Sequence, residues 1–184
     1  MLGAMTTPPT SRVALRMGNP QAPTSPWGRD EIEVFGDGRV VYRNQRGAFV
    51  RSATAQLTAE ATDKLFAAIA ASPFPQWSNT KPLPPGSTLV ELTVQRAGEA
   101  SESAAAAGGA AGAAAAAEAR VQFDYHTALK TPGYDAVVKL ITGWTGILRT
   151  PRDKRAASAE LTDIVDQPTG QPTGQPPGKS GPSS

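Results

Sequence analysis

The chain has 184 residues, and its 18 Lys and Arg residues nearly balance its 16 Asp and Glu residues, which leaves a formal charge of only +2. This balance argues against a surface dedicated to nucleic acid. Cysteine is absent and histidine occurs once, which excludes disulfide-bonded folds, cysteine nucleophiles and metal sites built on cysteines or several histidines.

The composition also bears on organisation and location. Hydrophobic residues make up 39% of the chain, and its 18 glycines and 17 prolines exceed the usual share of a globular domain, so part of the chain is expected to be disordered. The Ala/Gly run 104–117 is too weakly hydrophobic to span a bilayer. No apolar run follows basic residues near the start of the chain, so no signal peptide is predicted and a cytoplasmic location is favoured.

Three segments are predicted to lie outside the folded core. Residues 1–10 form a polar leader, and residues 98–118 are mostly Ala, Gly, Ser and Glu, which is typical of a flexible insertion between two strands. Residues 150–184 contain a short apolar stretch around Leu161 and then Gln-Pro-Thr-Gly repeats, which bury too little apolar surface to offset chain entropy. One domain is therefore predicted over residues 11–149.

The first half of this domain has the pattern of antiparallel strands. Val13 and Leu15 alternate with other residues and predict a first strand. Asp37-Gly38 lies between two alternating runs, which predicts a tight hairpin because this dipeptide favours the turn that joins adjacent strands. A further strand is predicted after Gly47.

A helix and a second hairpin are predicted next. Thr58 suits a helix N-cap, and Ser72-Pro73 suits the end of the same helix. Alternation over residues 89–96 predicts a strand with one wet face, and the alternation around Phe123 predicts its partner across the insertion.

The last predicted helix begins at Thr131-Pro132, an N-cap followed by proline at the first helical position. Its apolar residues recur at helical spacing: Val137, Leu140, Ile141, Trp144, Ile147 and Leu148. We expect Trp144 in the core. The order strand, hairpin, helix, hairpin, helix predicts an α+β domain of two layers, in which two helices pack on one face of an antiparallel sheet.

Asp124 and His126 are the only candidates for catalysis. On a strand they share a face, where the carboxylate would orient the imidazole as a base. The same pattern is typical of a solvated strand face, since the opposite face is apolar. A small hydrolase or isomerase is therefore an alternative function, and no metal or cofactor site is predicted.

Four basic residues follow the last helix: Arg149, Arg152, Lys154 and Arg155. Positive charge at this position complements the C-terminus of a helix. The alternative is contact with phosphate or an acidic partner, which would be weak and salt-sensitive with so few charges.

The long loop over residues 72–87 is the candidate partner-binding segment. It is rich in proline and longer than a typical connection. Trp77, Leu83 and Pro84 are the candidate anchors, because prolines restrict the unbound loop and an aromatic anchor concentrates binding energy. Trp77 alternatively fills the edge of the core, and the prolines suit any stiff surface loop.

The order of elements over residues 30–148 resembles small bacterial proteins of the emfourin type, and also other small bacterial α+β domains with an Asp-Gly-x-Val-x-Tyr hairpin. The resemblance is carried by Leu57-Thr58-Ala59-Glu60, Leu65-Phe66, Ser72-Pro73-Phe74-Pro75, Leu92-Thr93-Val94 and Val121-Gln122-Phe123. It implies inhibition of thermolysin-like metallopeptidases, and it assigns no functional residue.

Taken together, these features predict a non-catalytic binding or regulatory module that acts on a protein partner through surface loops. A structural or envelope-associated protein whose tail is a spacer is a further alternative to the enzyme.

Overall fold

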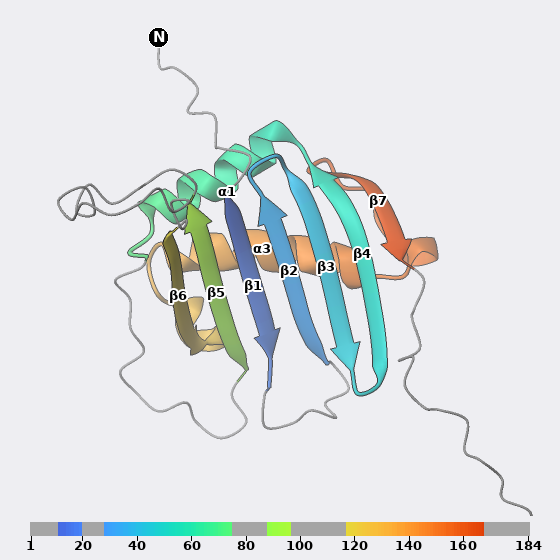
Figure 1. Cartoon of the computed structure of the whole chain (residues 1–184), viewed down its shortest axis with the longest axis horizontal. Coiled ribbons are helices and arrows are strands. Elements are labelled where there is room, and N and C mark those ends of the chain that lie inside the picture. Colours follow the sequence, from blue (N-terminus) through green and yellow to red (C-terminus); the bar gives the residue numbers. More distant parts are fainter. Residues whose placement is uncertain (1–10, 20–27, 75–87, 97–116, 168–184) are drawn as a thin grey trace, which may run out of the picture.

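The computed structural model describes residues 11–19, 28–74, 88–96 and 117–167. Seven strands form one antiparallel sheet in the order β6-β5-β1-β2-β3-β4-β7, and α3 crosses behind them (Figure 1). The strands are β1 (Arg12–Gly18), β2 (Arg29–Phe35), β3 (Arg39–Arg46), β4 (Phe49–Leu57), β5 (Leu89–Arg96), β6 (Ala117–Asp124) and β7 (Leu161–Gln167). The helices are α1 (Ala59–Ala71), α2 (Tyr125–Ala128), α3 (Tyr134–Arg149) and the 3₁₀ turn η2 (Arg152–Lys154).

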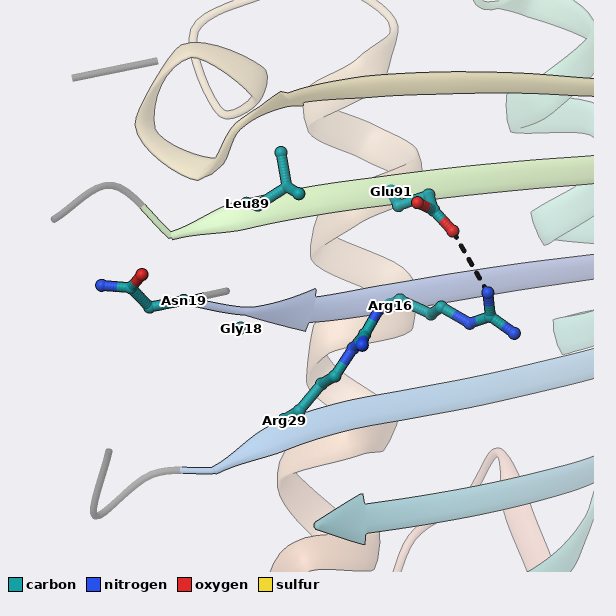
Figure 2. A pocket seen from close by; sticks show the side chains of 6 residues that line it. All are labelled: Arg16, Gly18, Asn19, Arg29, Leu89 and Glu91. Carbon is teal, nitrogen blue, oxygen red and sulfur yellow. Dashed lines mark hydrogen bonds and ion pairs between the residues drawn. The ribbon is translucent and has the colours of Figure 1, made fainter. Parts of the chain in front are cut away.

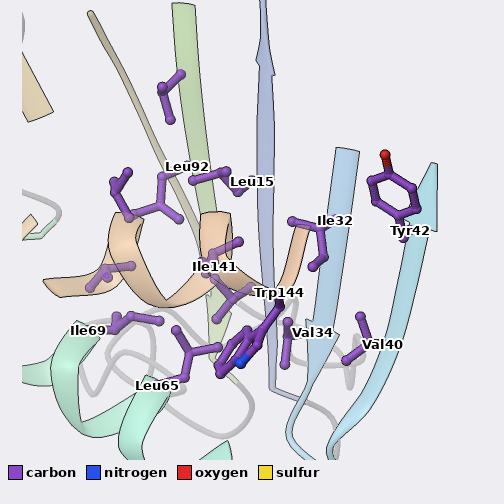
Figure 3. Packing of buried hydrophobic residues seen from close by; sticks show 14 of the residues in the cluster. Leu15, Ile32, Val34, Val40, Tyr42, Leu65, Ile69, Leu92, Ile141 and Trp144 are labelled. Carbon is purple, nitrogen blue, oxygen red and sulfur yellow. The ribbon is translucent and has the colours of Figure 1, made fainter. Parts of the chain in front are cut away.

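Helices α1 and α3 cover one face of the sheet, which confirms the predicted α+β fold. Alternate strand residues that face the helices are almost fully buried: Val13, Leu15, Ile32, Val34, Val40, Tyr42, Leu92 and Phe123. Figure 3 shows Leu65 and Ile69 of α1 turned toward Ile141 and Trp144 of α3. Trp144 is 2% exposed, so its predicted place in the core is confirmed. The opposite face of the sheet carries no helix in the described part of the chain.

The hairpin between β2 and β3 forms at the predicted Asp37-Gly38 turn. Gly38 has a φ of +82°, and a Cβ there would lie 2.9 Å from the carbonyl oxygen of Leu57. The backbone N–H of Leu57 donates to the carbonyl of Gly38 at 2.8 Å. Glycine is therefore required both by the left-handed backbone and by the close approach of β4.

The ends of α1 lie where the sequence predicts them, whereas the start of α3 does not. Thr58 Oγ1 accepts a hydrogen bond from the N–H of Ala61 at 3.2 Å, so the predicted N-cap is confirmed. The predicted start at Thr131-Pro132 is wrong, because α3 begins at Tyr134 with Gly133 as its N-cap. Thr131 Oγ1 instead donates to the carbonyl of Thr127 at 2.8 Å, so its hydroxyl serves the turn after α2.

The folded domain continues beyond residue 149, so the predicted tail is wrong for residues 150–167. β7 pairs with β4, and Leu161 at its start is 3% exposed. The composition suggested disorder because β7 has few apolar residues. Its stability comes instead from backbone hydrogen bonds to the edge of β4, which also pair the free N–H and C=O groups of that edge.

The other predicted low-complexity segments lie mainly outside the described residues. β6 begins at Ala117, so the strand takes the last two residues of the predicted insertion 98–118. Residues 97–116, 1–10 and 168–184 are not described.

Candidate functional site

Asp124 and His126 do not share a strand face, so that prediction is wrong. β6 ends at Asp124, whose Oδ1 accepts a hydrogen bond from the N–H of Thr127 at 3.1 Å and so caps α2. His126 is exposed on that short helix. The hydrolase or isomerase alternative therefore loses the arrangement on which it rested.

The loop anchors Trp77, Leu83 and Pro84 lie outside the described residues. Their role in binding stays a prediction.

A hollow lies between α1 and α3, and we call it the helix groove. It is open to solvent and has a volume of about 540 Å³, which is within the range of ligand pockets, roughly 300–1,000 Å³. Its lining residues are Lys64, Ala68, Ala136, Lys139, Leu140, Gly143, Trp144, Ile147 and Glu160. Most of these residues are apolar or lack a side chain, so the helix groove is a largely apolar surface.

Gly143 lines the helix groove, and the packing of the described residues does not account for a glycine at this position. Gly143 and Gly146 both lie inside α3, where glycine costs about 1 kcal/mol relative to alanine. A Cβ built at either position would meet no atom within 4 Å. Neither glycine has a positive φ. The chain therefore carries two helix-weakening residues that its own packing does not require.

Two lysines line the helix groove, one from each helix. Lys64 of α1 contacts Glu160 at 3.5 Å, and Glu160 also accepts a hydrogen bond from Trp144 Nε1 at 2.8 Å. Lys139 of α3 pairs with Asp135 one turn earlier, at 3.1 Å. Both lysines are well exposed, so these pairs are weak and either lysine can exchange its partner at little cost.

On the other side of the sheet, which we call the open face, charged side chains form a network around Glu91. Arg16 links Glu31 to Glu91, with N–O distances of 2.6 and 3.3 Å. Arg120 also donates to Glu91, and Gln122 Nε2 does so at 2.8 Å. Burial by itself would raise the pKa of Glu91, but these hydrogen bonds and the nearby arginines together lower it.

A smaller hollow of about 50 Å³ lies on the open face beside this network (Figure 2). Six residues line it: Arg16, Gly18, Asn19, Arg29, Leu89 and Glu91.

A buried polar cluster holds the end of α3 against the sheet. Asp30 accepts hydrogen bonds from Tyr42 Oη at 2.8 Å and from Asn44 Nδ2 at 2.9 Å, and Arg149 donates to its second oxygen. Burial, and then the charge of Asp30, raise the pKa of Tyr42 well above its usual range. None of these four residues lines the helix groove or the smaller hollow, so we interpret the cluster as structural.

The basic residues after α3 divide between two roles. Arg155 donates to the carbonyls of Ile147 and Thr150, at 3.2 and 3.0 Å, so the predicted support of the helix C-terminus is confirmed for this residue. Arg149 instead turns to Asp30. Arg152 and Lys154 are exposed.

Sequence reasoning missed the helix groove, the polar cluster and the smaller hollow. Asp30 at a position that alternates with core residues was the available signal for the polar cluster. The helix groove had no local signal beyond Gly143 inside α3.

In the described ranges, no group of three or more His, Asp or Glu side chains is placed to hold a metal ion, and no helix is long and apolar enough to cross a membrane. No protein-family model matches the sequence, and no curated protein matches it significantly.

Proposed function

We propose that this protein is a non-catalytic binding module that holds an amphipathic helix of a partner protein in the helix groove. The observation that carries this proposal is the groove itself, an open and largely apolar surface between α1 and α3. Helix-in-groove binding uses this kind of surface, because apolar side chains of the incoming helix leave water on docking.

The shape of the helix groove supports a helix as the occupant. The lining residues of α3 run from Ala136 to Ile147, which at 1.5 Å per residue is about 16 Å, or roughly three turns of a docked helix. Gly143 lies between these ends and removes the side chain that would keep the two backbones apart. A docked helix would thus give Gly143 the packing role that it lacks in the chain alone.

The charges at the helix groove indicate acidic residues on the partner helix. Lys64 lines the groove from α1 and Lys139 lines it from α3, and each is paired with one half-buried carboxylate. A partner that places a Glu or Asp near each lysine gains two ion pairs around an apolar centre. Such pairs add selectivity more than affinity.

A synthetic amphipathic peptide of about 15 residues, with a leucine face and glutamates near both ends, tests the proposal. Its binding is measured by fluorescence anisotropy to the full chain and to Gly143→Leu, which fills the groove. Gly146→Leu is the matched control, because Gly146 lies on the same helix in equally open space but does not line the groove. We expect Gly143→Leu to weaken binding about tenfold or more and Gly146→Leu to change it less than about twofold.

The same titration with lysines in place of the glutamates tests the charge argument, and we expect weaker binding. Equal affinity of the wild type and Gly143→Leu would overturn the proposal, provided that both variants unfold cooperatively near the wild-type temperature.

Because the sequence resembles emfourin-type proteins, a thermolysin-like peptidase is one candidate partner. Residual activity of such a peptidase is measured with increasing wild-type protein and with two variants. Loss of inhibition in Gly143→Leu would assign the contact to the helix groove, whereas loss in Trp77→Ala alone would assign it to the loop. An unaffected peptidase would remove this identity and leave the groove to another partner.

A further inference from the structure

Three arginines surround one glutamate on the open face. The strand register places Arg16 of β1 and Arg43 of β3 directly opposite Glu31 of β2, one on each side. Arg29 lies two residues before Glu31 on β2 and therefore on the same face. It is a diagonal neighbour of Arg43, because its own partner in the register is Gln45. Diagonal neighbours on one face have Cα atoms about 7–8 Å apart.

Glu31 satisfies only one of the three arginines. Its Oε1 accepts a hydrogen bond from Arg16 Nε at 2.6 Å. Within the described ranges neither Arg29 nor Arg43 forms a salt bridge, and both are exposed. The neighbouring Glu91 adds no free negative charge, since Arg16, Arg120 and Gln122 already use it. This part of the open face therefore holds unneutralised positive charge.

The smaller hollow lies next to two of these arginines. Arg16 and Arg29 both line it, and Figure 2 shows the side chain of Arg29 reaching from β2 toward Arg16 on β1. Gly18, two residues after Arg16 on β1, lies beside Arg29, and a Cβ there would be 3.3 Å from the Cβ of Arg29, so a larger residue would crowd the arginine. The volume of about 50 Å³ exceeds the 10–15 Å³ that one water needs, and has room for roughly one tetrahedral oxyanion.

The geometry points to an oxyanion site in this hollow, in which Arg29 binds a phosphate monoester and Arg43, its diagonal neighbour, adds positive charge beside it. Arg16 and Glu91 line the same hollow but are paired with each other, and Arg16 also pairs with Glu31. A phosphate monoester carries close to two negative charges at neutral pH and has three terminal oxygens. The planar guanidinium of arginine donates two parallel hydrogen bonds to such a group. The site lies across the sheet from the helix groove and does not depend on the proposed function.

Isothermal titration at constant ionic strength tests the site with inorganic phosphate and with a phosphoserine peptide. Arg29→Gln removes the main ligand, and Arg43→Gln removes a neighbouring charge. Arg152→Gln is the matched control, because Arg152 is also exposed and forms no salt bridge in the described ranges. We expect Arg29→Gln to weaken phosphate binding about tenfold, Arg43→Gln to weaken it less, and Arg152→Gln to leave it within about twofold.

The two ligands separate the sources of the phosphate. Tighter binding of the phosphoserine peptide would assign the site to a phosphorylated protein segment, and equal binding would assign it to a free phosphate compound. A peptide with glutamate in place of phosphoserine is the control for general acidity. Equal affinity for this control, or equal losses in Arg29→Gln and Arg152→Gln, would overturn the proposal. Gly143→Leu should leave phosphate binding unchanged, so this test and that of the helix groove fail separately.

Discussion

Glu91 is the most enclosed charge of the open face, at 4% exposure. Its carboxylate joins β5 to β1 through Arg16 and to β6 through Arg120. The arginines and Gln122 outweigh the effect of burial, so the pKa of Glu91 lies below its ordinary value. The charged form therefore stabilises the sheet, and the side chain acts as a cross-strand tie.

Glu91→Gln should lower the free energy of unfolding at pH 7 by about 1–3 kcal/mol, because it leaves the arginines without this charged acceptor. A group whose folded pKa is depressed stabilises the protein above its unfolded pKa of about 4.3 and ceases to do so as the pH falls through the folded pKa. The difference between wild type and variant should thus shrink at pH 3. Urea unfolding at pH 7 and pH 3 measures it, and an equal difference at both values would contradict the assignment.

Trp144 combines the largest core side chain of α3 with a polar contact to Glu160 at 2.8 Å. Trp144→Ala should lower the free energy of unfolding by about 3–5 kcal/mol, since it removes a buried aromatic ring. Trp144→Phe keeps a ring but removes the hydrogen-bond donor and should cost about 1 kcal/mol from that loss alone. Chemical denaturation measures both, and a cost below about 1 kcal/mol for Trp144→Ala would mean that the ring is not part of the core.

At the scale of elements, the two sides of α3 differ in how they are stabilised. Hydrogen bonds fasten its C-terminal end to the sheet, whereas its outward side carries two glycines that lower helix stability. Its C-terminal carbonyls are satisfied by Arg155 and by Arg51 of β4, which donates to the carbonyl of Arg149 at 2.9 Å. Arg51 and Arg155 both also bind Asp166 of β7. The hydrogen bond from Arg155 is the main cause that lowers the pKa of Asp166. This network fastens the end of α3 to the edge of the sheet.

The outward side of α3 holds Gly143 and Gly146, and each should be replaceable. Gly143→Ala and Gly146→Ala should each raise the free energy of unfolding by about 0.5–1 kcal/mol, because alanine restricts the unfolded chain and meets no atom in the folded one. Gly133→Ala is the control and should destabilise, since Gly133 has a φ of +87°. Thermal and urea unfolding measure all three. A loss of stability in Gly143→Ala would mean that the space beside it is filled in the free protein.

At the scale of the whole molecule, β7 closes one edge of the sheet by covering β4. Truncation after Arg149 removes Leu161, Asp166 and Arg155 together and exposes the edge of β4. We expect it to lower the free energy of unfolding by about 3 kcal/mol or more, from the burial of leucine and the lost ion pairs. Truncation after Gln167 removes none of the described contacts and should change stability by less than about 0.5 kcal/mol. Equal melting temperatures for both truncations would contradict the role of β7.

The local elements could be predicted because their signals lie within a few neighbouring residues. Asp37-Gly38 specifies its turn through backbone preference, and Thr58 specifies the start of α1 through one hydrogen bond. The apolar stripe of α3 predicts which side is buried, and Trp144 lies on it. One local signal was overridden by a neighbouring interaction. Thr131 hydrogen-bonds to Thr127 in the turn after α2 instead of capping α3, so α3 begins later than predicted.

The sequence by itself thus determined the strands of the meander, the two long helices and the α+β class, because these follow from periodicity and turn chemistry. Only the tertiary structure decided that β7 joins the sheet, since its stability comes from the open edge of β4 and not from its own side chains. The tertiary structure also formed the helix groove and brought the arginines together around Glu31. Both depend on how elements distant in the chain lie side by side, which no local pattern of residues specifies.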